Sequence, residues 1–209
     1  MNTKQVDKSH YDFRKYVDQL RWASLWHQLT ELIELNPGRV LEVGPGPGLF
    51  KAAAGAVGVC VETLDLDPEL RPDHVASIFE MPFEDGEFDV VCAFQVLEHL
   101  PLKKSLEAFR EMARVAERSV ILSLPNAAKR FPVSIHIPRF GFFRFSIPKP
   151  RIKAPKHEFD GEHYWEIGKE GYSEKEVISR FCSIEGVQLI RNYRVPENPY
   201  HHMFILKVS

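Results

Sequence analysis

Apolar residues recur at roughly helical spacing near the N-terminus of the chain. Between residues 9 and 35 they occupy Phe13, Tyr16, Leu20, Leu25, Leu29, Leu32 and Ile33. This spacing predicts an amphipathic helix, which forms an N-terminal helical cap over residues 1–37. Ser9 with Asp12 is expected to cap the start of the helix, and Asn36-Pro37-Gly38 to end it.

Short apolar runs that alternate with helical patterns follow this cap. The runs predict strands at residues 39–43, 58–66, 73–77, 88–94, 119–124, 187–195 and 201–208. Helical patterns cover residues 49–56, 101–116 and 173–183, and Ser173 with Glu176 gives the last of them a capping box. The alternation indicates an α/β domain with a mainly parallel sheet. The last two strands have no helix between them, which suits antiparallel pairing.

The stretch "RVLEVGPGPGLF", residues 39–50, is the first candidate site. Glycines after a first strand allow a ligand to approach the backbone, and the next helix begins with free N–H groups. The spacing is G-x-G-x-G, whereas a dinucleotide-binding loop needs glycine at position 49, where Leu49 stands. Glu42 lies inside the predicted strand, and a carboxylate there is costly unless a ligand or partner compensates it. A tight turn without a ligand is the alternative interpretation.

A second carboxylate, Asp65, is predicted at the end of the second strand, about twenty residues after the glycine loop. A carboxylate in this place can accept hydrogen bonds from both hydroxyls of a ribose. It could instead cap the following segment, but Asp67, beside Pro68, is the better candidate for a cap. We therefore assign Asp65 to a ribose.

The composition restricts the number of domains, the partners and the cellular compartment that the sequence predicts. The chain has 209 residues, of which 44% are hydrophobic, enough for one domain with its own core. Its net charge of −2 gives the whole molecule no electrostatic attraction to nucleic acid. Cys60, Cys92 and Cys182 show no metal-type spacing and are expected to be buried free thiols in a reducing cytoplasm. Neither a signal peptide nor a membrane span is predicted.

Three segments together resemble the class I S-adenosylmethionine-dependent methyltransferases. "LEVGPGPG" is similar to the first motif of that family and "LDLDP" to the second, while "MPFEDGEFDVVCAFQVLEHL" resembles a segment of its small-molecule subgroup. The resemblance covers residues 39–126. It implies a Rossmann-like, doubly wound seven-stranded sheet of order 3-2-1-4-5-7-6, with strand 7 antiparallel, in a single domain over residues 1–209. It also implies S-adenosylmethionine as the cofactor.

The resemblance also assigns residues to parts of this cofactor. The methionine part is expected beside Glu42, Gly44, Pro45, Gly46 and Gly48, and Asp65 is expected to bind the ribose. Leu66, Ser77 and Ile78 are expected around the adenine, although family members often have an aspartate where this chain has Ser77. Phe94 and Gln95, after the fourth strand, are expected at the methyl-donor end.

Methyl transfer requires that the acceptor be aligned with the S–CH3 bond and that water be kept out. An acceptor of high pKa also needs a general base, for which His99 is the candidate. His99 could instead serve only to hold the loop at the start of a helix. Some quinone-pathway O-methyltransferases hold a metal with E-x-x-E-H at this place. The first carboxylate is Gln95 here, so no metal is predicted.

Residues 125–172 are too long for a simple connection after the fifth strand and are expected to form a lid insertion. Residues 129–156 of this basic-aromatic lid contain eight lysines and arginines, five phenylalanines and no acidic residue. They could cover an anionic or amphipathic small molecule, contact an anionic membrane, bind RNA, or serve only as a structural extension. We favour the small-molecule lid, with Tyr164 and Trp165 lining the acceptor pocket.

The remaining polar residues of the insertion, His157, Glu158, Asp160, Glu162, His163 and Glu166, lack a fixed metal spacing and are expected to cap and bond within the lid. His201-His202 could approach them, and Tyr11 and Tyr16 are further candidate lid residues. The predicted function is transfer of a methyl group to oxygen or nitrogen of a small molecule. The alternatives are a catalytically inactive partner subunit of the same fold and a nicotinamide-dependent oxidoreductase.

Overall fold

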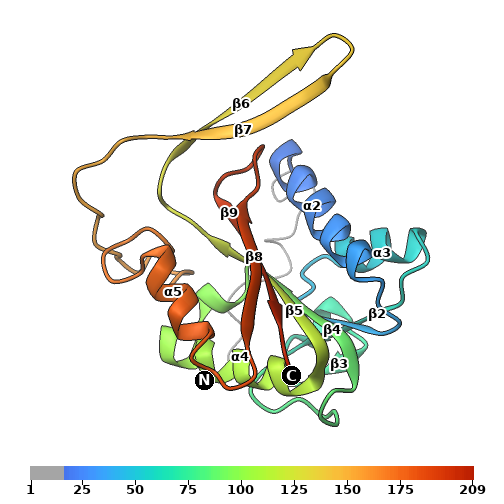
Figure 1. The fold of residues 1–209 in the computed structure, drawn as a ribbon. Helices are drawn as coiled ribbons and strands as arrows, with labels where there is room; N and C mark the ends of the chain where they lie inside the picture. Colours follow the sequence, from blue (N-terminus) through green and yellow to red (C-terminus); the bar gives the residue numbers. More distant parts are fainter. Residues whose placement is uncertain (1–16) are drawn as a thin grey trace.

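The computed structural model describes residues 17–209, and its centre is a seven-stranded sheet (Figure 1). The sheet strands are β1 (Val40–Val43), β2 (Val61–Asp65), β3 (His74–Val75), β4 (Phe88–Phe94), β5 (Ala116–Pro125), β8 (Gln188–Arg194) and β9 (His201–Lys207). Their order is β3-β2-β1-β4-β5-β9-β8, and β9 runs antiparallel to both neighbours. Counted along the chain, this is the predicted order 3-2-1-4-5-7-6, so the predicted fold class is confirmed.

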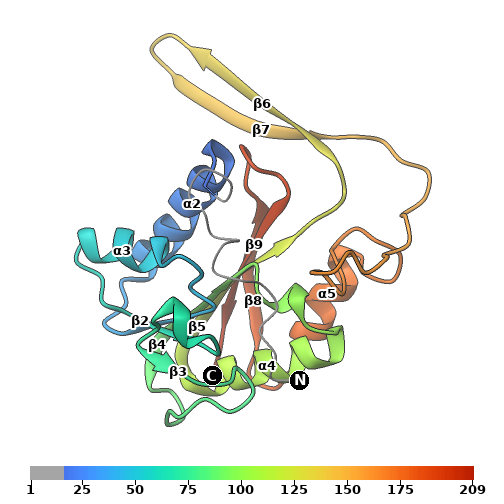
Figure 2. The same cartoon turned by 180° about the vertical axis from the view of Figure 1, so that it is seen from behind.

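Helices cover both faces of the sheet (Figures 1 and 2). On one face, α2 (Gln19–Leu35) and α3 (Leu49–Ala56) form an apolar cluster with one side of the strands. On the other face, α4 (Leu102–Val115) and α5 (Glu174–Phe181) pack in a larger cluster. Alternate residues of β4 point to opposite faces, so Val90 and Cys92 join the first cluster while Val91 and Ala93 join the second.

Polar residues cap both ends of α2 and the start of α5. α2 begins after Asp18, whose side chain accepts a hydrogen bond from the Arg21 N–H, so this helix starts later than the predicted Ser9. It ends at Asn36, as predicted, and Asn36 adopts the left-handed conformation. The predicted cap at Ser9 and Asp12, like Tyr11 and Tyr16, lies outside the described residues. The capping box of Ser173 and Glu176 at α5 is confirmed.

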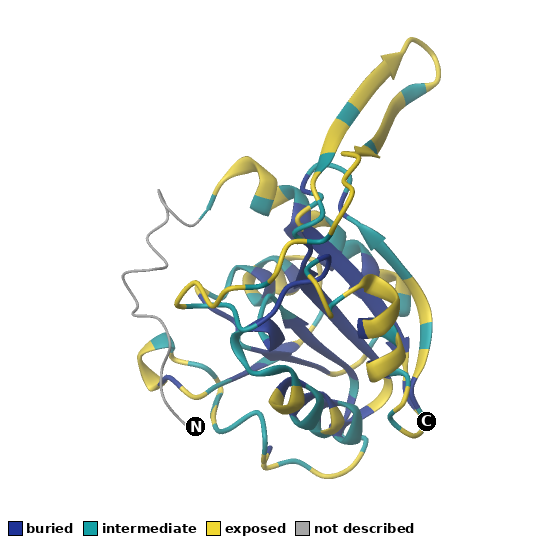
Figure 3. Cartoon of the chain, turned by 90° about the vertical axis from the view of Figure 1, so that its left-hand side faces the viewer, coloured by how far each residue is buried: buried dark blue, intermediate teal, exposed yellow. Residues whose placement is uncertain are grey.

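The insertion after β5 contains a hairpin that we did not foresee. β6 (Arg130–Ile137) and β7 (Gly141–Pro148) pair antiparallel as a separate two-stranded ribbon. The ribbon projects from the body of the molecule, and most of its residues are exposed (Figure 3). Irregular chain from residue 149 to 172 then leads back to α5. The basic-aromatic half of the insertion therefore extends outward.

Within residues 17–209 there are also two short 3-10 helices, η2 (Pro68–Leu70) and η3 (Leu97–His99). Asp67 caps η2 by accepting a hydrogen bond from the Glu69 N–H, as predicted. The expectation that all cysteines are buried is wrong for Cys60, which precedes β2 and is exposed, and for Cys182, which is only partly buried. Cys92 is buried in β4.

Candidate functional site

A cavity of about 890 Å³ opens at the carboxyl ends of β1, β2 and β4. In open α/β sheets, ligands bind at this edge of the sheet. Its walls come from the start of α2, the glycine loop, the end of β2, the segments after β3 and β4, residues 198–201 and the irregular part of the insertion. A smaller hollow of about 80 Å³ adjoins it, and Gly44, Phe94 and Gln95 line both spaces.

The glycine loop has the bare backbone that the sequence predicted. Gly44, Gly46 and Gly48 have φ angles of +69°, +52° and +74°, which L side chains rarely adopt. A Cβ on Gly44 would stand 2.7 Å from Val96 Cγ2, so a side chain has no room there. Gly48 caps α3 and lines neither of the two spaces, whereas Gly46 lines the cavity and Pro45 lines the small hollow.

Glu42 lies in β1 beneath this loop and lines the small hollow. Its side chain is buried, and its Oε2 has no hydrogen-bond partner within residues 17–209. Burial raises the pKa of Glu42 to about 8, although a backbone hydrogen bond from Lys51 works in the opposite direction. The carboxyl group is therefore held mostly neutral at pH 7 until a positive or hydrogen-bonding group reaches it.

Asp65 is the last residue of β2 and lines the main cavity. Its Oδ1 accepts a hydrogen bond of 2.9 Å from the Asp67 N–H, which orients the carboxylate. Burial raises the pKa of Asp65. Leu66, Ser77 and Ile78 line the cavity on the same side, so the structure brings these predicted residues together with Asp65.

Phe94 is the last residue of β4 and Gln95 follows it, and both line the two spaces. Phe94 packs edge-on against Phe50 with ring centroids 4.8 Å apart. Gln95 has a φ of +57°, unusual for a residue with a side chain, and its amide nitrogen donates to Ser123 Oγ over 3.2 Å. The backbone turns sharply here, and this brings the next residues to the rim of the cavity.

The second half of the insertion forms the remaining wall. Phe159, Gly161, Glu162, His163 and Tyr164 line the cavity, and the Tyr164 N–H donates to Glu98 O over 2.9 Å. Residues 159–164 are therefore the part of the predicted lid that lies against the cavity. None of residues 129–156 lines this cavity.

The prediction that Trp165 lines the acceptor pocket is wrong. Its side chain is 0% exposed and lies in the core cluster with α4 and α5. Its Nε1–H donates to Leu100 O and Ser105 Oγ, each over 3.1 Å. Tyr164 and Trp165 are neighbours in an irregular segment, but the side chain of Trp165 points into the core. Of the two, only Tyr164 reaches the cavity.

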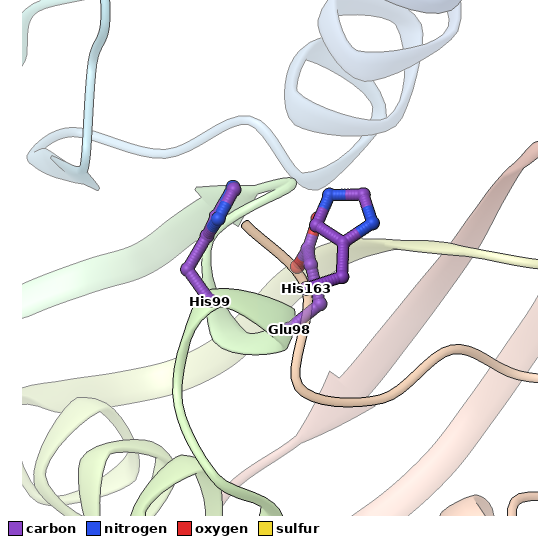
Figure 4. A group of neighbouring side chains, drawn as sticks. All are labelled: Glu98, His99 and His163. Carbon is purple, nitrogen blue, oxygen red and sulfur yellow. The ribbon is translucent and has the colours of Figure 1, made fainter. Parts of the chain in front are cut away.

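Three side chains lie close together: His99 and His163, which line the cavity, and the buried Glu98 beside them (Figure 4). One ligand atom from each lies within 4.8 Å of the other two, and the two imidazole rings are 5.1 Å apart between centroids. Sequence reasoning selected His99 and noted His163 only as a polar residue of the lid. Glu98 is fully buried, and burial raises its pKa to about 8.

Hydrogen bonds orient both imidazoles. His99 Nδ1 lies 3.1 Å from the carbonyl oxygen of Glu162, which can only accept, so Nδ1 carries the proton. His163 Nδ1 lies 3.4 Å from Glu166 Oε1. Burial lowers the pKa of His163, but the hydrogen bond with Glu166 and the nearby carboxylates outweigh burial and raise it. Tyr200 donates a hydrogen bond to the same Glu166 carboxylate.

Other polar residues of the insertion bond within it, as predicted. Asp160 accepts hydrogen bonds from the Glu162 and His163 N–H groups over 3.0 and 2.7 Å. His157 Nε2 lies 2.9 Å from His163 O. Burial lowers the pKa of His201 to about 4, so this ring is neutral where it lines the cavity.

Comparisons with known proteins agree with this geometry. Residues 41–124 match the methyltransferase domain family. An uncharacterized methyltransferase of Mycobacterium sp. (strain JLS) is 37% identical over 93 residues, which is 38% of this chain and 35% of that protein. A ubiquinone biosynthesis O-methyltransferase of Xanthomonas euvesicatoria pv. vesicatoria (strain 85-10) is 34% identical over 84 residues, 33% of this chain and 35% of that protein. The chain thus matches about a third of the length of these curated relatives.

Solved structures share the fold over nearly the whole chain. The 1,6-didemethyltoxoflavin-N1-methyltransferase of Burkholderia thailandensis superposes with a TM-score of 0.64 at 14% identity, covering 96% of this chain and 83% of that one. The magnesium protoporphyrin IX methyltransferase of Synechocystis PCC 6803 gives 0.60 at 15% identity, covering 99% and 90%. Residues 41–124 therefore match a methyltransferase domain, and the chain shares its fold with solved methyltransferases.

Proposed function

We propose that this protein transfers a methyl group from S-adenosylmethionine to oxygen or nitrogen of a small-molecule acceptor. The observation that carries the proposal is the pair of carboxyl groups, Glu42 and Asp65, that line two adjoining spaces beside the glycine loop. Both solved relatives described above were crystallised with bound S-adenosylhomocysteine. Their bound product supports the choice of cofactor.

In this proposal the cofactor lies across the two adjoining spaces. Asp65 accepts hydrogen bonds from the ribose hydroxyls, and Leu66, Ser77 and Ile78 surround the adenine. The methionine part follows the glycine loop, where Glu42 meets its ammonium group. Phe94 and Gln95 then stand beside the methyl group, and the acceptor approaches from the side of Tyr164.

His99 is suited to take a proton from the acceptor. Because its Nδ1–H donates to Glu162 O, the neutral ring presents Nε2 as the basic nitrogen. The acceptor loses its proton to Nε2, its oxygen or nitrogen forms a bond to the methyl carbon, and the C–S bond breaks. Phe159 and Tyr164 pack together with centroids 4.6 Å apart, and this aromatic wall with nearby Lys104 favours an anionic or amphipathic acceptor.

Calorimetric titration with S-adenosylmethionine and with NAD tests the proposed function. We expect binding of S-adenosylmethionine and none of NAD, because Leu49 stands where a dinucleotide loop needs glycine. Incubation of the protein and labelled cofactor with fractionated metabolites should then yield a methylated product. Binding of NAD alone would contradict the proposal.

Cofactor binding should release a proton from Glu42. With a pKa of about 8, this carboxyl group holds about 0.9 of a proton at neutral pH, and the cofactor's positive charge favours the ionised form. The affinity should therefore increase as pH rises toward about 8. Calorimetry in buffers of different ionisation enthalpy measures the released proton. Glu42→Gln should abolish the release, whereas the matched variant Glu98→Gln should keep it; the reverse outcome would contradict the role of Glu42.

We also propose that the hairpin makes peripheral contact with an anionic membrane on its cytoplasmic side. Alternation along β6 and β7 places Phe131, Val133, Ile135, Ile137, Phe143, Phe145 and Ile147 on one face of the ribbon. Six of these side chains, all except Val133, are 41–55% exposed. The opposite face turns toward the domain, because Arg144 forms an ion pair of 3.3 Å with Glu197.

The charge around this apolar face matches an anionic lipid surface. Residues 129–156 contain eight basic residues and no acidic one, and Arg139 lies at the turn of the hairpin. Basic residues near an anionic leaflet each contribute about 1 kcal/mol, and apolar side chains add burial in the interface. None of the described helices has the length and apolar character needed to cross a bilayer, so only a surface contact is proposed.

Vesicle co-sedimentation tests this contact. The protein should bind vesicles that contain phosphatidylserine and bind phosphatidylcholine vesicles more weakly. Phe143→Ser should lower the partition coefficient roughly five-fold or more, because it removes burial of a large apolar side chain. The matched variant Phe142→Ser changes the opposite face and should have a smaller effect. Equal losses in the two variants, or association of the hairpins into dimers without lipid, would contradict the proposal.

A further inference from the structure

We propose that Glu98, His99 and His163 bind a divalent transition-metal ion at the acceptor end of the cavity. The three residues come from η3 and from the insertion, and one ligand atom of each lies within 4.8 Å of the others (Figure 4). Two ligand atoms at about 2.1 Å from one ion are at most about 4.2 Å apart. Small inward rotations of the side chains therefore complete the site.

The buried carboxyl group of Glu98 is an observation independent of this spacing. Its side chain is 0% exposed, and no other residue within 17–209 donates a hydrogen bond to either of its oxygens. A buried polar group without a partner costs several kcal/mol, and proteins compensate such groups with hydrogen bonds, opposite charges or metal ions. A cation between Glu98 and the two imidazoles compensates the carboxylate directly.

The hydrogen bonds of the two histidines prepare them as ligands. Nδ1 of His99 donates to the carbonyl oxygen of Glu162, and Nδ1 of His163 faces Glu166 and Asp160 at 3.4 and 3.8 Å. Metal-binding histidines commonly donate their other ring N–H to a carbonyl or carboxylate, which fixes the tautomer and raises the basicity of the ligand nitrogen. In both rings Nε2 is then the nitrogen directed to the ion.

Two imidazoles and one carboxylate form the ligand set of several catalytic zinc sites, with a fourth position left for water or substrate. Zn²⁺ and Co²⁺ both suit such donors. This inference rests on the proposed function for its consequence: with the ion bound, His99 Nε2 is a ligand and no longer the base, and an acceptor hydroxyl on the ion would lose its proton to water more easily before its oxygen attacks the methyl carbon. The ion undergoes no change of oxidation state in this step.

Titration of the cofactor-free protein with Co²⁺, followed by visible absorption, tests the site, and calorimetry with Zn²⁺ repeats the measurement. We expect one ion per chain. Glu98→Gln, His99→Ala and His163→Ala should each weaken binding at least about ten-fold, because each removes a direct ligand. His136→Ala is the matched control, since this histidine lies on the hairpin, and it should bind as the wild type does.

Absence of Co²⁺ and Zn²⁺ binding in the wild-type protein would overturn the inference, as would unchanged affinity in both histidine variants. Circular dichroism verifies that each variant is folded, and titration with S-adenosylmethionine verifies that its cofactor space is intact. Two histidine variants are used so that the test still holds if one of them does not fold. Because metal binding is measured without cofactor or acceptor, its failure is distinguishable from failure of the proposed methyl transfer.

Discussion

Replacing Asp65 with alanine should raise the Kd for S-adenosylmethionine roughly 10- to 150-fold. Hydrogen bonds to a charged group contribute about 1.5–3 kcal/mol, and in the proposed pose the ribose loses its acceptor. The Asp67 N–H, which now donates to Asp65 Oδ1 over 2.9 Å, also loses its partner in the variant. Calorimetric titration of the wild type and the variant measures the change.

Asp89→Ala is the matched control for this experiment. Asp89 lies near the amino end of β4, where its carboxylate accepts hydrogen bonds from the Gly38 and Arg39 N–H groups. Loss of this carboxylate should lower stability and leave the Kd for the cofactor unchanged, provided that the protein is folded at the temperature of the titration. An unchanged Kd in Asp65→Ala would show that the ribose binds elsewhere.

Replacing Trp165 with alanine should lower the free energy of unfolding by about 3–5 kcal/mol, because the change leaves a large cavity in the core. The variant also loses the donor to Leu100 O and Ser105 Oγ. Urea denaturation followed by circular dichroism measures this loss. Trp26→Ala is the matched control: its side chain is 62% exposed, so its free energy of unfolding should change by about 0.5 kcal/mol or less. Equal losses would contradict the anchoring role of Trp165.

Much of the sheet could be predicted from the sequence, because each strand is a short apolar run beside a turn or a capped helix. The spatial order of the strands followed from the family resemblance. The hairpin was missed although Phe131, Val133 and Ile135 stand at alternate positions, since Pro132 lies within β6 and Pro148 ends β7. Pro132 is tolerated because a two-stranded ribbon has an open edge on each strand, where no N–H is needed.

The placement of Glu42 and Asp65 at the carboxyl edge of the sheet could also be predicted, because both stand at strand positions whose place in a parallel sheet is known. The acceptor side could not. His163 lies far from His99 in sequence, within a segment without regular structure, and only the packing of the insertion brings their rings to 5.1 Å. Trp165 was assigned to the acceptor pocket because of its residue type. Its burial depends on packing against α4, which no local sequence pattern shows.

The buried indole of Trp165 helps to anchor residues 159–164, and under the proposed function this places the acceptor side on a different part of the chain from the cofactor side. Glu42 and Asp65 belong to strands, whereas Tyr164 and His163 belong to an insertion that Trp165 ties to α4. Relatives that keep this tether can therefore exchange the intervening segment and change the molecule they modify without altering how they hold the methyl donor. Chimaeras that graft foreign loops upstream of Trp165 offer a route to new acceptors.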